Sequence, residues 1–171
     1  MNINKLGAGK NPQNGEINVV IEIPEGSLIK YEIDKESGVM MVDRFATTTM
    51  GYPTNYGFVP NTHADDGDAL DVLVLTSQNM HPGTGIACRV VGMLEMEDEA
   101  GIDTKVIAVP TKKADPFMAH IDSIDDIEEI TKKKIKHFFD HYKDLEEGKW
   151  VKTKGFLGTE QAIEEIKKSL T

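Results

Sequence analysis

The acidic segment from Asp65 to Asp71 holds the densest group of side chains that could do chemistry. It places four carboxylates within seven positions, directly before an apolar run. Carboxylates this close repel one another, so several stay ionised only if a cation lies among them or a proton is shared. Mg²⁺ takes oxygen ligands, keeps several waters and binds substrate phosphates. The segment therefore predicts a metal platform to which the rest of the chain brings a phosphate.

A solvated turn is the simplest alternative for this segment, because Asp-Gly pairs are ordinary turn chemistry. A calcium-binding EF-hand is the other alternative. That loop needs glycine at its sixth position and glutamate at its twelfth. Counting from Asp65, these positions hold Leu70 and Thr76, and the register that starts one residue later fails as well. The EF-hand is therefore excluded.

The composition sets the broad class of the protein. A chain of 171 residues with 39% apolar content predicts one domain, residues 1–171, with a real core. Its formal net charge of -10 opposes binding to nucleic acid and to anionic membranes. The single cysteine, Cys88, excludes an internal disulfide and favours a reducing compartment. The N-terminal residues show no apolar signal segment. A cytoplasmic protein is the expectation.

The apolar pattern predicts a chain dominated by short strands. β-branched and alternating runs indicate strands at residues 17–23, 29–33, 39–42, 71–75, 85–94, 105–109 and 149–156. A capping pattern at Ser123 and apolar residues at helical spacing, Ile127, Ile130, Ile135, Phe138 and Tyr142, predict one helix. A second, short helix is expected from Gly158 to Leu170. Because the helices are not interleaved with the strands, we expect a small closed β-barrel with helices outside.

Three further features are ambiguous from the residues alone. Tyr52 and Tyr56 lie in the Gly/Pro-rich stretch 45–61 and could contact a ligand or anchor the core. Glu22 interrupts an apolar strand, as an edge residue or a site residue. His137 and His141 have half the spacing of a zinc motif, but that motif needs Glu directly after the first histidine. A solvated or helix-end histidine pair is the better interpretation.

Seven blocks of the chain, in this order, resemble the family I soluble inorganic pyrophosphatases of the bacterial type. They read IEIP, IKYEIDKESG, VDRF, YPTNYG, DDGDALDVLV, DEAGIDTK and HFFDHYKDLEEGKWV, and the resemblance runs from about Gly7 to Ile166. One departure is visible. The family signature usually has proline where Ala69 stands, and proline would stiffen the loop through its fixed φ. Every carboxylate of the segment is kept, so we expect the chemistry to survive.

The resemblance implies a mainly β fold of the α+β type: an OB-like closed five-stranded β-barrel with extra strands and two peripheral α-helices. It implies hydrolysis of pyrophosphate to two orthophosphates, several Mg²⁺ ions per active site, and a homohexamer. It implies Asp68 as the general base. The implied metal ligands are Glu22, Glu32, Asp66, Asp71, Asp98 and Asp103. The implied substrate-binding residues are Lys30, Arg44, Tyr56, Lys105, Tyr142 and Lys143.

Two other functions compete with this one. An oligonucleotide-binding barrel would use basic grooves with stacking aromatics, but aromatic content is 6% and the charge balance is acidic. An inactive metal-binding protein is the other competitor. Apart from Ala69, every family position that can be matched keeps its residue, which speaks against a loss of activity. Release of phosphate from pyrophosphate, with and without Mg²⁺, distinguishes the three.

Overall fold

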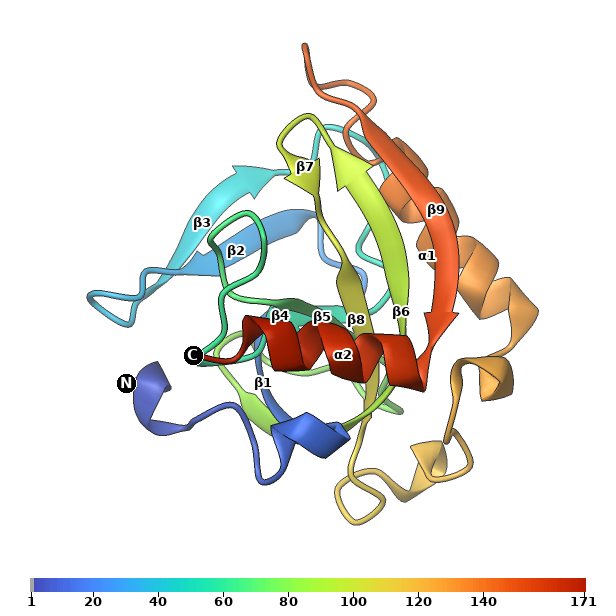
Figure 1. The fold of residues 1–171 in the computed structure, drawn as a ribbon. Helices are drawn as coiled ribbons and strands as arrows, with labels where there is room; N and C mark the ends of the chain where they lie inside the picture. Colours follow the sequence, from blue (N-terminus) through green and yellow to red (C-terminus); the bar gives the residue numbers. More distant parts are fainter. Residues whose placement is uncertain (1) are drawn as a thin grey trace.

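The computed structural model describes residues 2–171, which form nine β-strands and two α-helices (Figure 1). The strands are β1 (Glu16–Ile23), β2 (Ile29–Ile33), β3 (Met40–Phe45), β4 (Asn55–Phe58), β5 (Asp71–Val74), β6 (Gly85–Asp98), β7 (Gly101–Ile102), β8 (Lys105–Pro110) and β9 (Val151–Gly158). The helices are α1 (Glu129–His141) and α2 (Thr159–Ser169). The prediction of a mainly β chain with two helices is confirmed.

Seven of these strands within residues 2–171 form one sheet, in the order β1-β4-β5-β8-β6-β7, with β9 also paired to β6. β1 pairs with both β4 and β6, so the hydrogen-bonded order returns to its first strand. β5 and β8 are parallel, and the other pairings in this sheet are antiparallel. β2 and β3 form a separate hairpin, which stands to one side in Figure 1.

Two buried apolar clusters hold the sheet to the helices. Successive side chains of a strand point to opposite faces, and along β5 both faces are buried. Val72 belongs to a cluster that includes Ile166 of α2, whereas Leu73 belongs to a second cluster that includes Phe139 of α1. Each fully buried side chain of this size contributes about 1.5–3 kcal/mol. These clusters fix the first residues of β5 and β8, where the pocket begins.

The stretch 45–61 contains a strand that the sequence did not reveal. β4 is completely buried and pairs with both β1 and β5. A Cβ atom at Gly57 would lie 2.0 Å from the carbonyl oxygen of Val20, so only glycine allows this close pairing. Glycine and proline normally indicate a loop, which is why the strand was missed.

Two predicted boundaries are wrong, with consequences for the pocket. β6 continues to Asp98, four residues beyond the predicted end of the strand 85–94. β3 continues to Phe45, so Arg44 lies within the strand and directly opposite Lys30 of β2. A ladder position fixes the backbone of Arg44 more firmly than a strand end would.

The first helix begins later than the capping pattern suggested. The capping box of Ser123 and Asp126 closes a 3₁₀ turn at Ile124–Asp126, and α1 begins only at Glu129. Ile130, predicted on the apolar face, is 68% exposed. Phe139 is buried in its place, next to Phe138. α1 therefore presents Ile135, Phe138 and Phe139 to the sheet.

Candidate active site

The acidic loop, residues 62–70, folds back on itself before β5. Its two ends are joined by a hydrogen bond that the Leu70 amide donates to the Thr62 hydroxyl. At the tip, Gly67 has a φ of 86°, a value that favours glycine. The Asp68 amide donates to Oδ1 of Asp66 at 2.9 Å. Asp66 and Asp68 both line the same pocket.

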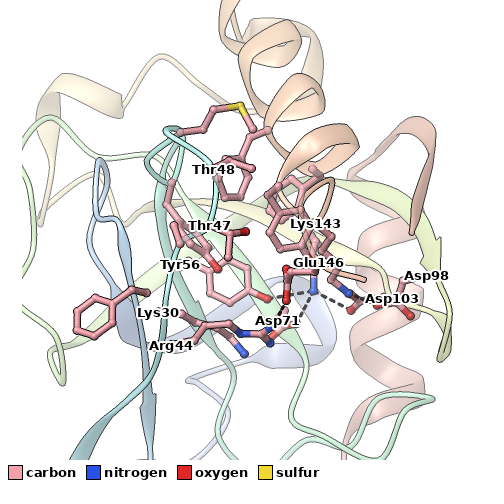
Figure 2. A pocket seen from close by; sticks show the side chains of 18 of the residues that line it. Lys30, Arg44, Thr47, Thr48, Tyr56, Asp71, Asp98, Asp103, Lys143 and Glu146 are labelled. Atoms are coloured by element: carbon pink, nitrogen blue, oxygen red, sulfur yellow. Dashed lines mark hydrogen bonds and ion pairs between the residues drawn. The ribbon is translucent and has the colours of Figure 1, made fainter. Parts of the chain in front are cut away.

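Lys105 is the central cation of the site. The parallel pairing of Val72 with Val106 sets Asp71 and Lys105 side by side at the start of β5 and β8. Nζ of Lys105 lies 2.6 Å from Asp71 Oδ2, 2.7 Å from Asp103 Oδ1 and 3.0 Å from the Tyr56 hydroxyl (Figure 2). The Lys105 side chain is only 3% exposed. All three hydrogens of its ammonium group therefore have an oxygen partner.

Electrostatics around Lys105 favour its charged form. Burial alone would lower the pKa of Lys105, but Asp71, Tyr56 and Asp103 outweigh it, and the pKa lies well above the usual value. Burial raises the pKa of Asp103, although Lys105 opposes this shift. Burial also raises the pKa of the Tyr56 phenol well above its usual value, so its hydroxyl keeps its proton and can donate a hydrogen bond.

A second group of charges comes from the hairpin. Lys30 of β2 lies 3.2 Å from Asp43 of β3. Arg44 donates from Nε to Asp43 Oδ2 at 2.9 Å and from Nη1 to Glu146. Burial alone would lower the pKa of Arg44, but Asp43 and Glu146 outweigh it and raise it. Lys30 and Arg44 therefore present two fixed positive charges to the pocket.

The end of α1 supplies the opposite wall. Tyr142, the C-cap of α1, stacks on Phe138 with ring centroids 5.1 Å apart. Lys143 follows, and its Nζ lies 2.9 Å from Asp98 Oδ2, at the end of β6. Burial alone would raise the pKa of Asp98, but the bonds from Lys143 and the Ala100 amide outweigh it and lower the pKa. Asp98 is therefore a carboxylate anion.

These groups face one cavity of about 210 Å³. Among the predicted site residues, those that line it are Lys30, Arg44, Tyr56, Asp66, Asp68, Asp71, Asp98, Asp103, Lys105, Tyr142 and Lys143. Within residues 2–171 its wall holds four cationic side chains and six carboxylates, the sixth being Glu146. Of those six, Asp68 alone makes neither a hydrogen bond nor an ion pair through its carboxylate within residues 2–171.

Two predicted metal ligands do not line this cavity. Glu22 is buried, and its Oε1 accepts a hydrogen bond from the Ile33 amide at 2.9 Å. Burial raises the pKa of Glu22 to about 7. Glu32 has an exposed side chain whose nearest cation is Lys30, at 3.9 Å. Glu22 thus ties β1 to β2.

Several pocket residues were not foreseen from the sequence. Thr47, Thr48 and Glu146 appear beside the predicted groups in Figure 2. Tyr52, which the sequence left undecided, is buried against Phe138 and also lines the cavity. The hydroxyls in the Thr-rich stretch after Arg44 were the available signal for the threonines. The sequence held no signal for Glu146, because nothing distinguishes it from Glu147, the identical residue that follows.

The histidine pair stands apart from the cavity. His137 and His141 are exposed on α1, with ring centroids 4.7 Å apart. Nδ1 of His141 lies 2.8 Å from Asp144. The interpretation as a solvated helix-end pair agrees with these positions.

The donor set fits Mg²⁺ by its chemistry. The acids that line the cavity offer carboxylate oxygens, and within residues 2–171 its wall includes no histidine or cysteine. Hard cations prefer such oxygen ligands. In the described chain no three acidic, histidine or cysteine side chains are gathered tightly enough to hold an ion. Asp71 and Asp103 are instead bridged by the Lys105 ammonium.

Comparison with known proteins identifies relatives of this chain over almost its whole length. Residues 19–171 match the family model described as inorganic pyrophosphatase. An inorganic pyrophosphatase from Aquifex pyrophilus is 56% identical over 170 residues, covering 99% of this chain and 96% of the relative. A solved inorganic pyrophosphatase from Coxiella burnetii has a TM-score of 0.93 at 50% identity, covering 96% of this chain and 97% of that one. One from Thermus thermophilus has a TM-score of 0.92 at 44% identity, covering 98% and 96%.

These matches extend over nearly the whole chain. The fold and the charged pocket therefore define a hydrolase of the inorganic diphosphatase class. The chain belongs to the family I inorganic pyrophosphatases, enzymes that hydrolyse pyrophosphate. Within residues 2–171, no helix is long and apolar enough to cross a membrane.

Proposed function

We propose that the protein hydrolyses pyrophosphate to two orthophosphates in a Mg²⁺-dependent reaction in which Asp68 is the general base. The observation that carries the metal requirement is the charge of the cavity wall. Four cations and six carboxylates line it, so the wall itself is net negative and would repel a dense anion. Divalent cations are the additional positive charge that such a pocket needs before pyrophosphate can enter.

Asp66, Asp71, Asp98 and Asp103 are the residues that would hold the metal ions, with Glu22 and Glu32 contributing toward the substrate. Bound Mg²⁺ would supply positive charge against the phosphate oxygens and lower the pKa of a nearby water. Asp71 and Asp103 already converge on one point, the Lys105 ammonium. Asp66 belongs to the same cavity wall.

Asp68 is suited to proton transfer because its carboxylate is exposed in the cavity and free of other partners within residues 2–171. It would accept a proton from the water that attacks one phosphorus atom, while the bond from that phosphorus to the bridging oxygen breaks. The departing orthophosphate keeps that oxygen and the electrons of the broken bond. Arg44 offers a fork of donors and Lys30 a point charge to one phosphoryl group.

The other phosphoryl group would meet Tyr142 and Lys143, with Lys105 and Tyr56 between the two ends. Tyr142 resembles Tyr56 in that burial raises the pKa of its phenol, so it can donate a hydrogen bond. Phosphoryl transfer depends on positioning and charge neutralisation more than on covalent help. A pocket with four cations on separate elements meets that demand.

The test is release of orthophosphate from pyrophosphate, measured with excess Mg²⁺ and with a chelator. Asp68→Asn should lower kcat by about 10²–10⁴-fold while Mg²⁺ binding, measured by calorimetry, changes much less. Asp65→Asn is the matched control, since Asp65 lies in the same loop but does not line this cavity, and it should keep kcat within about twofold. Equal losses of turnover and metal affinity in Asp68→Asn would refute the base role.

The finer structural predictions belong to the same proposal. We infer that the ring of β1, β4, β5, β8 and β6 is an OB-like closed barrel, and that residues 1–171 act as one domain within a homohexamer. The returning strand order supports the barrel. The buried, unpaired Cys88 is consistent with work in the cytoplasm. Mass measurement in solution tests the hexamer.

A further inference from the structure

Glu146 is a carboxylate in the pocket wall that neither the proposed metal ligation nor the proton transfer uses. It lies in the segment 142–150, which follows α1 and also carries Tyr142 and Lys143. Its side chain is only 19% exposed, whereas the next residue, Glu147, is exposed. An acid placed in the wall of an anion pocket needs a cationic partner there.

That partner is Arg44, which belongs to the hairpin on the other side of the pocket. Nη1 of Arg44 donates to Oε1 of Glu146 (Figure 2). Nε of Arg44 donates to Asp43. Nη2 makes no hydrogen bond to any part of residues 2–171, so the fork keeps donors for a phosphoryl group. The contact joins residues 102 positions apart in sequence. Lys149 adds a weaker pair to Glu146, at 3.6 Å.

We propose that Glu146 is a positioning residue for pyrophosphate hydrolysis, which holds the Arg44 guanidinium in the pocket wall and ties the segment 142–150 to β3. The inference rests on the proposed role of Arg44 as a phosphoryl ligand. Arg44 is 39% exposed, and a long side chain with that freedom loses rotamers when it grips a ligand. Restraining it beforehand reduces that loss and strengthens binding.

The contact between Arg44 and Glu146 also positions Lys143, the proposed ligand of the other phosphoryl group. Lys143 is fastened to Asp98 at the end of β6, and Glu146, three residues further on, is fastened to Arg44. The Glu146 amide donates to the Lys143 carbonyl oxygen at 3.0 Å, so the two residues share one turn. This turn therefore holds Arg44 and Lys143, the proposed ligands of the two phosphoryl groups, at a fixed separation.

Glu146→Ala and Glu146→Gln test the proposal through steady-state kinetics at saturating Mg²⁺. Both should raise KM for pyrophosphate about three- to tenfold, the equivalent of losing one ordinary, partly exposed hydrogen bond, with kcat within about twofold. Glu147→Ala is the matched control, because it removes the same charge one residue away and should leave both constants within twofold. Thermal unfolding of each variant shows that the fold is kept, and the Gln variant preserves the side-chain shape.

A double-mutant cycle with Arg44→Ala separates positioning from a general structural role. Arg44→Ala should raise KM by itself, and adding Glu146→Ala should raise it no further. An equal increase in both backgrounds, or a fall in KM on removing Glu146, would overturn the proposal. If Arg44→Ala leaves KM unchanged, the assignment of Arg44 as a phosphoryl ligand fails first, and that result is distinct from a failure of Glu146 alone.

Discussion

Replacement of Lys105 by methionine should destabilise the protein strongly at neutral pH. Methionine keeps an unbranched apolar side chain of similar length but removes the cation that lies 2.6 Å from Asp71 and 2.7 Å from Asp103. Removing one partner of a buried ion pair costs about 3–5 kcal/mol, because the remaining charges are left without compensation. The Asp71 side chain is 26% exposed and that of Asp103 16%, so we expect the low end, about 3 kcal/mol.

The loss should depend on pH. Burial already raises the pKa of Asp103, and Lys105 opposes that rise. Without Lys105 the pKa of Asp103 rises further, so the folded variant binds a proton that the unfolded chain has released. Stability then falls as pH rises from the unfolded value of Asp103 through its raised folded value. The deficit relative to the unmodified protein should therefore be larger at pH 7.5 than at pH 4.5.

Urea unfolding in the presence of a chelator, followed by circular dichroism at both pH values, measures this deficit. In a protein of this size about 3 kcal/mol corresponds to a fall in Tm of roughly 6–12 °C. Lys112→Met is the control, because Lys112 and Asp122 form an exposed pair at 3.3 Å whose loss should cost under about 1 kcal/mol. A deficit for Lys105→Met below 1 kcal/mol, or one equal at both pH values, would refute the argument.

Two further substitutions probe the surroundings of the site. Glu22→Gln should stabilise the chelated protein at pH 8 by up to about 3 kcal/mol and change its stability little at pH 4.5. The reason is that the folded pKa of Glu22 is about 7, so ionisation of Glu22 makes the folded protein less stable as pH rises from 4.5 to 7. Urea unfolding at both pH values checks this, and a gain independent of pH would contradict it. Ala69→Pro should add about 0.4–1 kcal/mol, because the Ala69 amide makes no hydrogen bond within residues 2–171 and proline restricts the unfolded chain. Thermal unfolding measures that gain, and a lower Tm would show that the loop cannot accept proline.

The strands that the sequence predicted well are those with β-branched residues on a regular period. The runs 17–23 and 29–33 match β1 and β2 within one residue. β4 escaped because its pairing depends on Gly57, whose lack of a side chain lets Val20 approach. A residue that normally indicates a loop was required here by packing, and packing against a distant strand cannot be read from local composition.

The site shows the same division between local and distant information. Asp66, Asp68 and Asp71 were recognisable because they crowd one short segment. Glu146 was not, because its role depends on contact with Arg44 across more than half the chain. Nothing in the sequence distinguishes Glu146 from Glu147, yet one lines the cavity and the other faces solvent. The difference arises in the turn after α1, which begins where Tyr142 stacks on Phe138.

The partners of the pocket acids separate structural roles from reactive ones. Lysines pair with three of these acids: Lys105 with Asp71 and Asp103, and Lys143 with Asp98. Lys143 helps to lower the pKa of Asp98, and Lys105 opposes the rise that burial causes in the pKa of Asp103. A group that must accept a proton and later release it cannot be held in this way. Asp68 lies among these acids but on the loop tip, beyond the reach of Lys105 and Lys143, so the fold leaves it the freedom that a general base needs.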